Sequence, residues 1–214
     1  MTNCMFSTPI AQYGWIGVIC AMVVSACATT PPVDSLANTP WPLRREALQN
    51  LHDWRVTGRI GVTNENEGWH ASLYWSQQGP AYAINLIGPL GQGRVRIWGD
   101  AHSVSVQTAD GRVLSATDPE QLLAATMDMR IPVSGLIYWI RGLPDPNQQS
   151  ELTGDNAGRL IRLEQNGWII DYLRYEQIAG LELPTRIRAR QNGLNVQLVV
   201  NEWNLQPDTF STAI

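Results

Sequence analysis

An alternation of apolar and polar side chains is the most regular feature of the chain. It begins at Trp54, from which Val56, Ile60 and Val62 alternate with polar or small residues. Runs with the same period follow at residues 71–76, 82–86, 95–97 and 104–106. A period of two places successive side chains on opposite faces of a strand. The pattern therefore predicts consecutive β-strands, each with one buried face.

Three dipeptides typical of tight hairpins divide the rest of the chain: Asp110-Gly111, Asn166-Gly167 and Asn192-Gly193. Such pairs favour the positive φ angles that type I′ turns require. Strand patterns flank the second and third pair, over residues 160–164, 168–175, 185–190 and 194–203. Short hairpins join antiparallel strands. We expect one antiparallel sheet of about 11 strands, which is enough to curl into an incomplete, open β-barrel.

Helical patterns are few. One follows Pro42 and runs to about Leu51, and a second begins at Asp118-Pro119-Glu120-Gln121, with Asp118 as the expected N-cap. Ser134 is a candidate cap for a third helix, Gly135–Arg141, which Gly142 would end. This last segment is apolar on nearly all sides, so it must be covered. We predict that it acts as a plug or lid on the sheet.

The N-terminal region indicates export and lipidation. Residues 14–24 form an apolar run of eleven residues, too short for a membrane-spanning helix and typical of a secretory signal. Val24-Ser25-Ala26-Cys27 matches the bacterial lipobox, although residues 1–13 contain no Lys or Arg. The alternative is an ordinary signal peptide with an incidental cysteine. We expect a lipoprotein signal at 1–26, a lipidated Cys27 and flexible tether at 27–42, a folded domain at 43–205 and a tail at 206–214.

Lipidation would give Cys27 an N-acyl diacylglycerol, and several acyl chains anchor a protein stably. Ala28 follows, and the absence of Asp at this sorting position favours the outer membrane over the inner one. Cys4 and Cys20 would leave with the signal. No disulfide could then form, and neither a cysteine nucleophile nor a zinc–cysteine site would remain.

Composition and charge exclude several functions. The net charge of −4 disfavours nucleic acid as a partner. All fifteen basic residues are Arg, which excludes a Schiff-base or P-loop lysine. His52, His70 and His102 lack metal-ligand spacing, and no G-x-S-x-G motif occurs. We expect a protein that is not an enzyme and that uses no metal or cofactor.

Apolar positions are the remaining candidates for function. Eight of them share a strand face or the third helix: Trp54, Ile60, Leu73, Trp75, Ile84, Leu86, Leu136 and Trp139. They form either an ordinary core or the wall of a cavity for acyl chains. Leu90, in the turn Gly88-Pro89-Leu90-Gly91, either packs back on the sheet or stands exposed to a bilayer or a partner.

Short motifs, in order, give the chain a resemblance to the LolB family over about residues 48–203. Besides the lipobox they are Leu51-x-x-Trp54 leading to Gly58, Leu73-x-Trp75 with Gln77, Gly88-Pro89-Leu90-Gly91, Ile131-Pro132 leading to Trp139-x-x-Gly142-Leu143-Pro144, Gln165-Asn166-Gly167-Trp168 with Tyr172, Leu183-Pro184, and Trp203.

This resemblance implies an incomplete antiparallel β-barrel with a helical lid over a hydrophobic cavity. It implies a protein, expected to be monomeric, that accepts acylated lipoproteins from a LolA-like periplasmic carrier. Cargo would enter the inner leaflet of the outer membrane, with Leu90 as the residue that contacts the bilayer. Two rivals stay open: an anchored lipid- or glycolipid-binding structural lipoprotein without carrier contact, and a lipid-anchored hydrolase.

Overall fold

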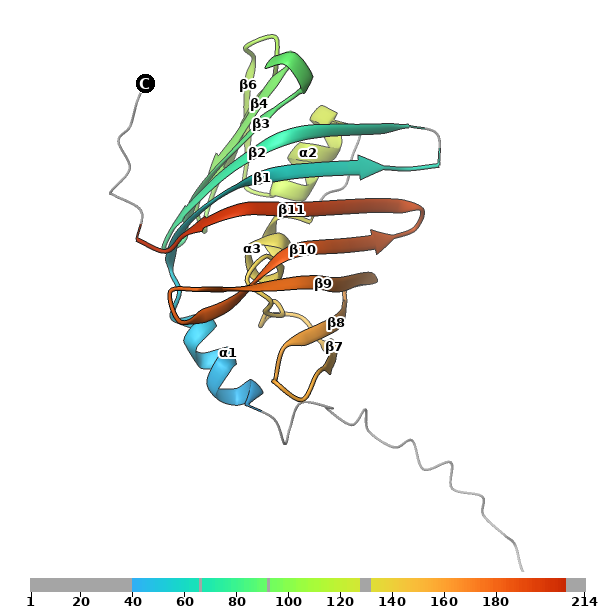
Figure 1. The fold of residues 1–214 in the computed structure, drawn as a ribbon. Helices are drawn as coiled ribbons and strands as arrows, with labels where there is room; N and C mark the ends of the chain where they lie inside the picture. The colour runs from blue at the N-terminus through green and yellow to red at the C-terminus, as the bar shows by residue number, and fades with distance from the viewer. Residues whose placement is uncertain (1–39, 66, 92, 128–131, 207–214) are drawn as a thin grey trace, which may run out of the picture. The chain divides into compact units, whose positions relative to one another are not determined.

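A single antiparallel sheet of eleven strands carries the fold in the described residues, 40–65, 67–91, 93–127 and 132–206 of a computed structural model (Figure 1). The strands are β1 (Asp53–Thr63), β2 (Gly68–Gln78), β3 (Ala81–Ile87), β4 (Arg94–Gly99), β5 (Val104–Gln107), β6 (Val113–Ala116), β7 (Ser150–Gly154), β8 (Leu160–Gln165), β9 (Trp168–Ile178), β10 (Leu181–Gln191) and β11 (Leu194–Asn204). The helices are α1 (Trp41–Gln49), α2 (Pro119–Met127) and α3 (Val133–Trp139), with a 3₁₀ turn, η1 (Pro89–Gly91).

The strand order is β6-β5-β4-β3-β2-β1-β11-β10-β9-β8-β7. The first and last strands of the chain pair in the middle of the sheet, and β6 and β7 form its two unpaired edges. The sheet is therefore open, as the sequence predicts. Helices α2 and α3 lie in the connection between these two edges, so the chain must cross one face of the sheet there. Figure 1 shows both helices behind the strands, on that inward face.

The inward face holds the core, and its side chains follow the predicted alternation. In β1, Trp54, Val56, Ile60 and Val62 are buried. The fully buried Trp54 ring lies between two other indoles, with ring centroids 5.1 Å from Trp75 and 5.4 Å from Trp203. No helix in the described ranges is long and apolar enough to cross a membrane.

Gly58 permits the two halves of the sheet to meet. The register between β1 and β11 shifts between Thr57 and Gly58. A Cβ atom at Gly58 would lie 2.2 Å from the backbone oxygen of Val199, closer than real Cβ atoms approach. The close approach explains why glycine occupies this interior strand position.

Several local predictions differ from the structure. The first helix runs from Trp41 to Gln49, and Pro42 lies inside its first turn, where no backbone N–H is needed for a helical hydrogen bond. Ser134 does not cap α3, which already begins at Val133. The Asp110-Gly111 turn is longer than two residues, since the Thr108 amide donates to the Arg112 carbonyl oxygen and only Gly111 has positive φ. By contrast, the Asp118 carboxylate accepts from the Gln121 amide at 2.9 Å, as expected of an N-cap.

Candidate functional site

An apolar cavity of about 40 Å³ lies between the inward face of the sheet and the two inner helices. Its wall contains no polar side chain. Strands β1–β4 and β11 and helices α2 and α3 supply the lining: Ile60, Leu73, Trp75, Ile84, Leu86, Ile97, Leu123, Val133, Leu136, Val196 and Leu198. Such a wall offers an occupant hydrophobic contact and no directional hydrogen bond.

Six of the eight residues singled out from the sequence line this cavity: Ile60, Leu73, Trp75, Ile84, Leu86 and Leu136. The structure places the other two beside it. Trp54 belongs to the indole cluster described above. Trp139 packs on Trp168, with ring centroids 6.0 Å apart, and its indole N–H donates to the Gln165 side-chain oxygen at 2.9 Å. These two side chains support the wall and the lid from behind.

The cavity is too small for an acyl chain. One buried water needs about 10–15 Å³ of such space, so the cavity admits only a few water-sized groups. An acyl chain therefore requires the lid or the wall to move. Because an apolar wall of Leu, Ile and Val has no internal hydrogen bonds to break, such a movement loses only packing contacts.

Polar contacts hold the lid unevenly. The Glu120 carboxylate accepts hydrogen bonds from the Ser134 amide, at 3.1 Å, and from the Ser134 hydroxyl, which joins α2 to α3. The C-terminal end of α3 is fixed to the sheet, since the buried Tyr172 hydroxyl donates to the Trp139 carbonyl oxygen at 3.0 Å. Together with the Trp139–Gln165 hydrogen bond, this makes the end of α3 the anchored side of the lid.

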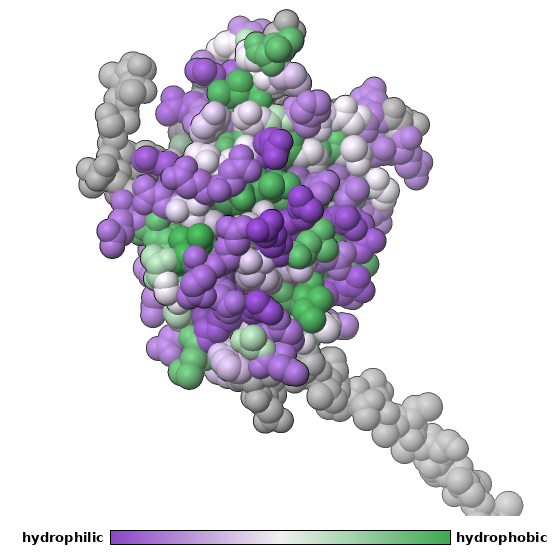
Figure 2. All heavy atoms as spheres, in the orientation of Figure 1, coloured by the Kyte–Doolittle hydropathy of each residue, from purple (hydrophilic) through white to green (hydrophobic). Residues whose placement is uncertain are grey.

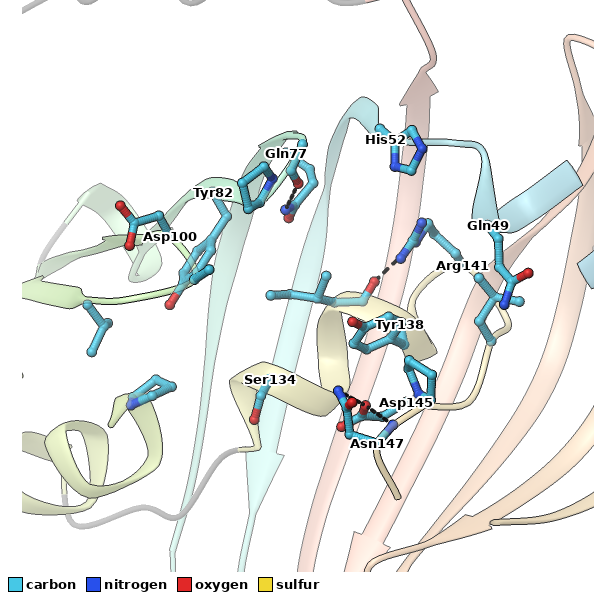
Figure 3. Close-up of a pocket in the computed structure, with 18 of the residues that line it drawn as sticks. Gln49, His52, Gln77, Tyr82, Asp100, Ser134, Tyr138, Arg141, Asp145 and Asn147 are labelled. Atoms are coloured by element: carbon cyan, nitrogen blue, oxygen red, sulfur yellow. Dashed lines mark hydrogen bonds between the residues drawn. The ribbon is translucent and has the colours of Figure 1, made fainter. Parts of the chain in front are cut away.

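A larger pocket of about 620 Å³ lies at one end of the same strands (Figure 3). Its lining mixes apolar side chains with hydrogen-bonding ones, and it is called the polar pocket below because the first cavity has none. Gln77 follows the cavity residue Trp75 on the inward face of β2, and Tyr82 precedes Ile84 on β3. Helix α3, the segment after it, the end of α1, the start of α2 and the turns after β2 and β4 supply most of the remaining lining. Its lining therefore continues the apolar cavity along the same strand faces with hydrogen-bonding groups.

Arg141 is the central charged residue of this pocket, and 7 % of its surface is exposed. Its guanidinium donates to the carbonyl oxygens of Leu48 and Leu51, at 3.2 and 2.8 Å, and to that of Ile137 at 3.2 Å. It also lies over the Tyr138 ring, 5.6 Å from the centroid. Burial lowers the pKa of Arg141, and no described carboxylate forms an ion pair with it.

Tyr82 brings a hydroxyl to the pocket. Burial, aided by the negative charges of Glu120 and Asp100, raises the pKa of Tyr82 to about 12. The phenol is therefore a neutral donor at physiological pH. Sequence reasoning missed this pocket, although Gln77 gave a signal. Gln77 is a polar residue at an apolar position of the strand alternation, and it is buried and hydrogen-bonded.

Leu90 stands at the tip of η1 with 97 % of its surface exposed. Its φ of 56° lies in the left-handed region, which a non-glycine residue enters at a cost of about 1–3 kcal/mol. The Gly88 amide donates to the Gly93 carbonyl oxygen at 3.0 Å and closes the loop. Figure 2 shows a hydrophobic tip where Figure 1 draws η1. The loop thus presents an apolar side chain on a strained backbone, and this side chain packs against no part of the fold.

Cys27 and Ala28 lie outside the described residues. Within those residues, no group of three or more His, Cys, Asp or Glu side chains could hold a metal ion. The positions of His52, His70 and His102 agree with this, since all three are exposed and lie on separate elements or turns.

Comparison with known proteins gives one family. The model of the family "Outer membrane lipoprotein LolB" matches residues 52–203. The outer-membrane lipoprotein LolB of Stutzerimonas stutzeri is 37 % identical over 187 residues, which cover 86 % of this chain and 91 % of that protein. LolB of Pseudomonas aeruginosa is 39 % identical over 163 residues, covering 76 % and 80 %.

Solved structures extend the comparison at 10 % sequence identity. A DUF1329 family protein from Desulfovibrio piger matches with a TM-score of 0.50, over 82 % of this chain and 95 % of that one. A LolA superfamily protein from Nitrosomonas europaea has a TM-score of 0.49, over 78 % and 94 %. The first likeness concerns the fold alone. The family match and the sequence relatives go further, and by them the chain belongs to the LolB family of outer-membrane lipoproteins.

Proposed function

We propose that this protein accepts acylated lipoproteins from a LolA-like periplasmic carrier and inserts them into the inner leaflet of the outer membrane. The observation that carries the proposal is the wholly apolar cavity under helices that cross the open sheet. The relatives of this chain are named outer-membrane lipoproteins, which supports a lipid anchor on Cys27 and sorting through Ala28. Membership of this family agrees with a protein that is not an enzyme and needs no cofactor.

The chemistry of the cargo explains why a cavity is needed. Burying one methylene of an acyl chain is worth about 0.8 kcal/mol, so exposing a whole chain to water costs on the order of 10 kcal/mol. Free diffusion of the cargo is therefore negligible. Transfer from one apolar cavity directly into another keeps the chains out of water. With no nucleotide to drive the process, its direction follows from higher affinity of the chains for the receptor than for the carrier, and for the bilayer than for the receptor.

Acyl chains enter, in this proposal, by displacement of α2 and the N-terminal half of α3. The C-terminal end of α3 stays in place, because Tyr172, Gln165 and Arg141 hold it to the sheet and to α1. The movable part contacts the cavity through Leu123, Val133 and Leu136, whose side chains lose only packing contacts when it moves.

The polar pocket takes the polar part of the same cargo. Its position beyond Trp75 and Ile84 on the same strand faces allows one ligand to reach both. Ester and amide carbonyl oxygens next to the acyl chains need donors, which Arg141, Tyr82 and Gln77 can supply. Leu90 then enters the bilayer and aids release, because its exposed side chain gains hydrophobic burial there.

A transfer assay tests the proposal. A carrier loaded with one acylated lipoprotein is mixed with this protein in the absence of nucleotide and of membrane, and the cargo is followed by pull-down. Movement of cargo to this protein is the expected result. If the cargo stays on the carrier while a fluorescent long-chain fatty acid still binds, the protein is a lipid-binding structural lipoprotein instead.

A further inference from the structure

A row of arginines crosses the outward face of the sheet beside the Leu90 loop. Arg59 on β1 pairs with Ser72 on β2, Ser72 with Ile87 on β3, and Ile87 with Arg94 on β4. On the other side, Arg59 pairs with Val199 of β11, and Val199 with Arg186 of β10. Residues paired in register share a face. At about 4.8 Å per strand, Arg94 and Arg186 lie roughly 14 and 10 Å from Arg59.

These three arginines have no counter-ion. Arg59, Arg94 and Arg186 are exposed, and within the described residues their side chains form no hydrogen bond or ion pair. The whole chain carries a net charge of −4. No described carboxylate therefore neutralises these three positive charges. Figure 2 shows the outward face covered largely by hydrophilic side chains, below the hydrophobic tip.

The row adjoins the loop that carries Leu90. A groove of about 240 Å³ lies between that loop and the outward face, and its lining includes Arg59, His70, Ser72 and Leu90. The exposed side chain of Leu90 and the unpaired guanidinium of Arg59 thus line the same groove. Ile87, the last residue of β3, places the loop directly beyond the row.

We propose that Arg59, Arg94 and Arg186 bind the phosphate groups of anionic glycerophospholipids. The inference rests on the membrane step of the proposed function, because it requires Leu90 to enter the leaflet. With the leucine among the acyl chains, the groove beside it reaches the level of the headgroups. The end of the outward face next to this loop, where Ile87 pairs with Ser72 and Ser72 with Arg59, then lies at the leaflet.

The chemistry of arginine fits this ligand. A guanidinium presents paired N–H donors that match two oxygens of one phosphate, and it is less strongly hydrated than an ammonium group. Basic side chains near an anionic membrane strengthen binding roughly fivefold each. The attraction falls off beyond the Debye length, about 10 Å at 0.1 M salt, so only residues close to the membrane contribute.

Vesicle binding tests the proposal with the non-lipidated chain 28–214, which contains all of the described residues. The vesicles are phosphatidylcholine alone or an equimolar mixture with phosphatidylglycerol. The test variant is Arg59→Gln/Arg94→Gln. The control, Arg45→Gln/Arg55→Gln, removes the same charge from positions that also lack ion pairs. Arg45 lies on α1, and Arg55 lies four residues before Arg59 on β1, about 13 Å farther from the Leu90 loop. Circular dichroism confirms folding of each.

The test variant is expected to bind the anionic vesicles about 25-fold more weakly, from roughly fivefold per arginine, while the control binds as the wild type does. Equal weakening in both variants would overturn the proposal, since net charge alone would then act. So would unchanged vesicle binding with slower uptake of cargo from the carrier, which would make the row a protein-docking face. The membrane-free transfer assay reports separately on the proposed function.

Discussion

The guanidinium of Arg141 donates a 2.8 Å hydrogen bond to the carbonyl oxygen of Leu51, 90 positions earlier in the chain. The bond joins the end of the lid helix to the segment that leads from α1 into β1. The Leu48 carbonyl oxygen also accepts from the Leu51 amide, at 3.3 Å, so it keeps a donor without Arg141. Leu51 is buried, and its oxygen depends on the arginine.

Replacing Arg141 with methionine should therefore destabilise the fold. Arg141→Met keeps the apolar stem but leaves the Leu51 oxygen unpaired, at a cost of about 1–3 kcal/mol. Arg141→Lys retains a charged donor and should recover part of the loss. Chemical denaturation measures both free energies of unfolding. Equal stability of wild type and Arg141→Met would show that the hydrogen bond contributes nothing.

Gly58 offers a sharper test of the sheet junction. In Gly58→Ala the new methyl group meets the Val199 oxygen, and overpacking against backbone costs about 1–3 kcal/mol or more. Gly61→Ala on the same strand is the control, because its nearest atom would be 4.0 Å away. Measured by thermal unfolding, the melting temperature of Gly58→Ala should fall far more than that of Gly61→Ala. Similar values for both would contradict the close approach.

The sequence predicts much of this sheet but not how its two halves join. Asn166 and Asn192 show the positive φ angles that their Asn-Gly pairs predict. Ala179 shows the same geometry at φ 46°, where no Asn or Asp signals it, because β9 and β10 pair on both sides and impose the turn. The pairing of β1 with β11 joins strands from opposite ends of the chain. No local pattern contains that information.

The candidate site, too, is predicted from the sequence only in part. Strand alternation assigns Ile60, Leu73 and Ile84 to the inward face, and all three line the cavity. Trp54 and Trp139 satisfy the same alternation or helical pattern, yet they pack beside the cavity. The difference lies in which side chains meet across the sheet, such as Trp54 with Trp203. Periodicity identifies a buried face but not where that face is filled.

Tyr82 should make the free energy of unfolding fall as the pH rises above 10. Its folded-state pKa of about 12 exceeds the ordinary 10.0, so the unfolded chain ionises first as the pH rises. The contribution is fully present below pH 10 and is lost as the pH approaches 12. In Tyr82→Phe this part of the decline should be missing, so denaturation measured from pH 8 to pH 12 should show a shallower slope. An identical slope in Tyr82→Phe and the wild type would mean that the Tyr82 hydroxyl is solvated in the folded protein.

Filling the cavity should separate ligand uptake from stability. Leu136→Phe enlarges a half-buried side chain beside about 40 Å³ of free space, so stability should change by less than about 1.5 kcal/mol. Binding of a fluorescent long-chain fatty acid should weaken severalfold. Leu173→Phe makes the same change on the exposed surface and is the control. Unchanged binding in Leu136→Phe would mean that acyl chains enter elsewhere.

Leu90→Glu should slow delivery about tenfold and leave the fold intact. The side chain is 97 % exposed, so the change removes no packing contact. A carboxylate at the centre of a bilayer costs about 2.5–3.5 kcal/mol, and at the shallower depth of a loop tip we expect insertion of cargo to slow about tenfold. Leu90→Met keeps an apolar tip and should retain delivery. Reconstituted transfer from the carrier through this protein into vesicles measures the rate.

Uptake of cargo from the carrier, measured without vesicles, should be equal in both variants, because the cavity lies on the other face of the sheet. Wild-type delivery by Leu90→Glu would exclude the loop from the membrane step.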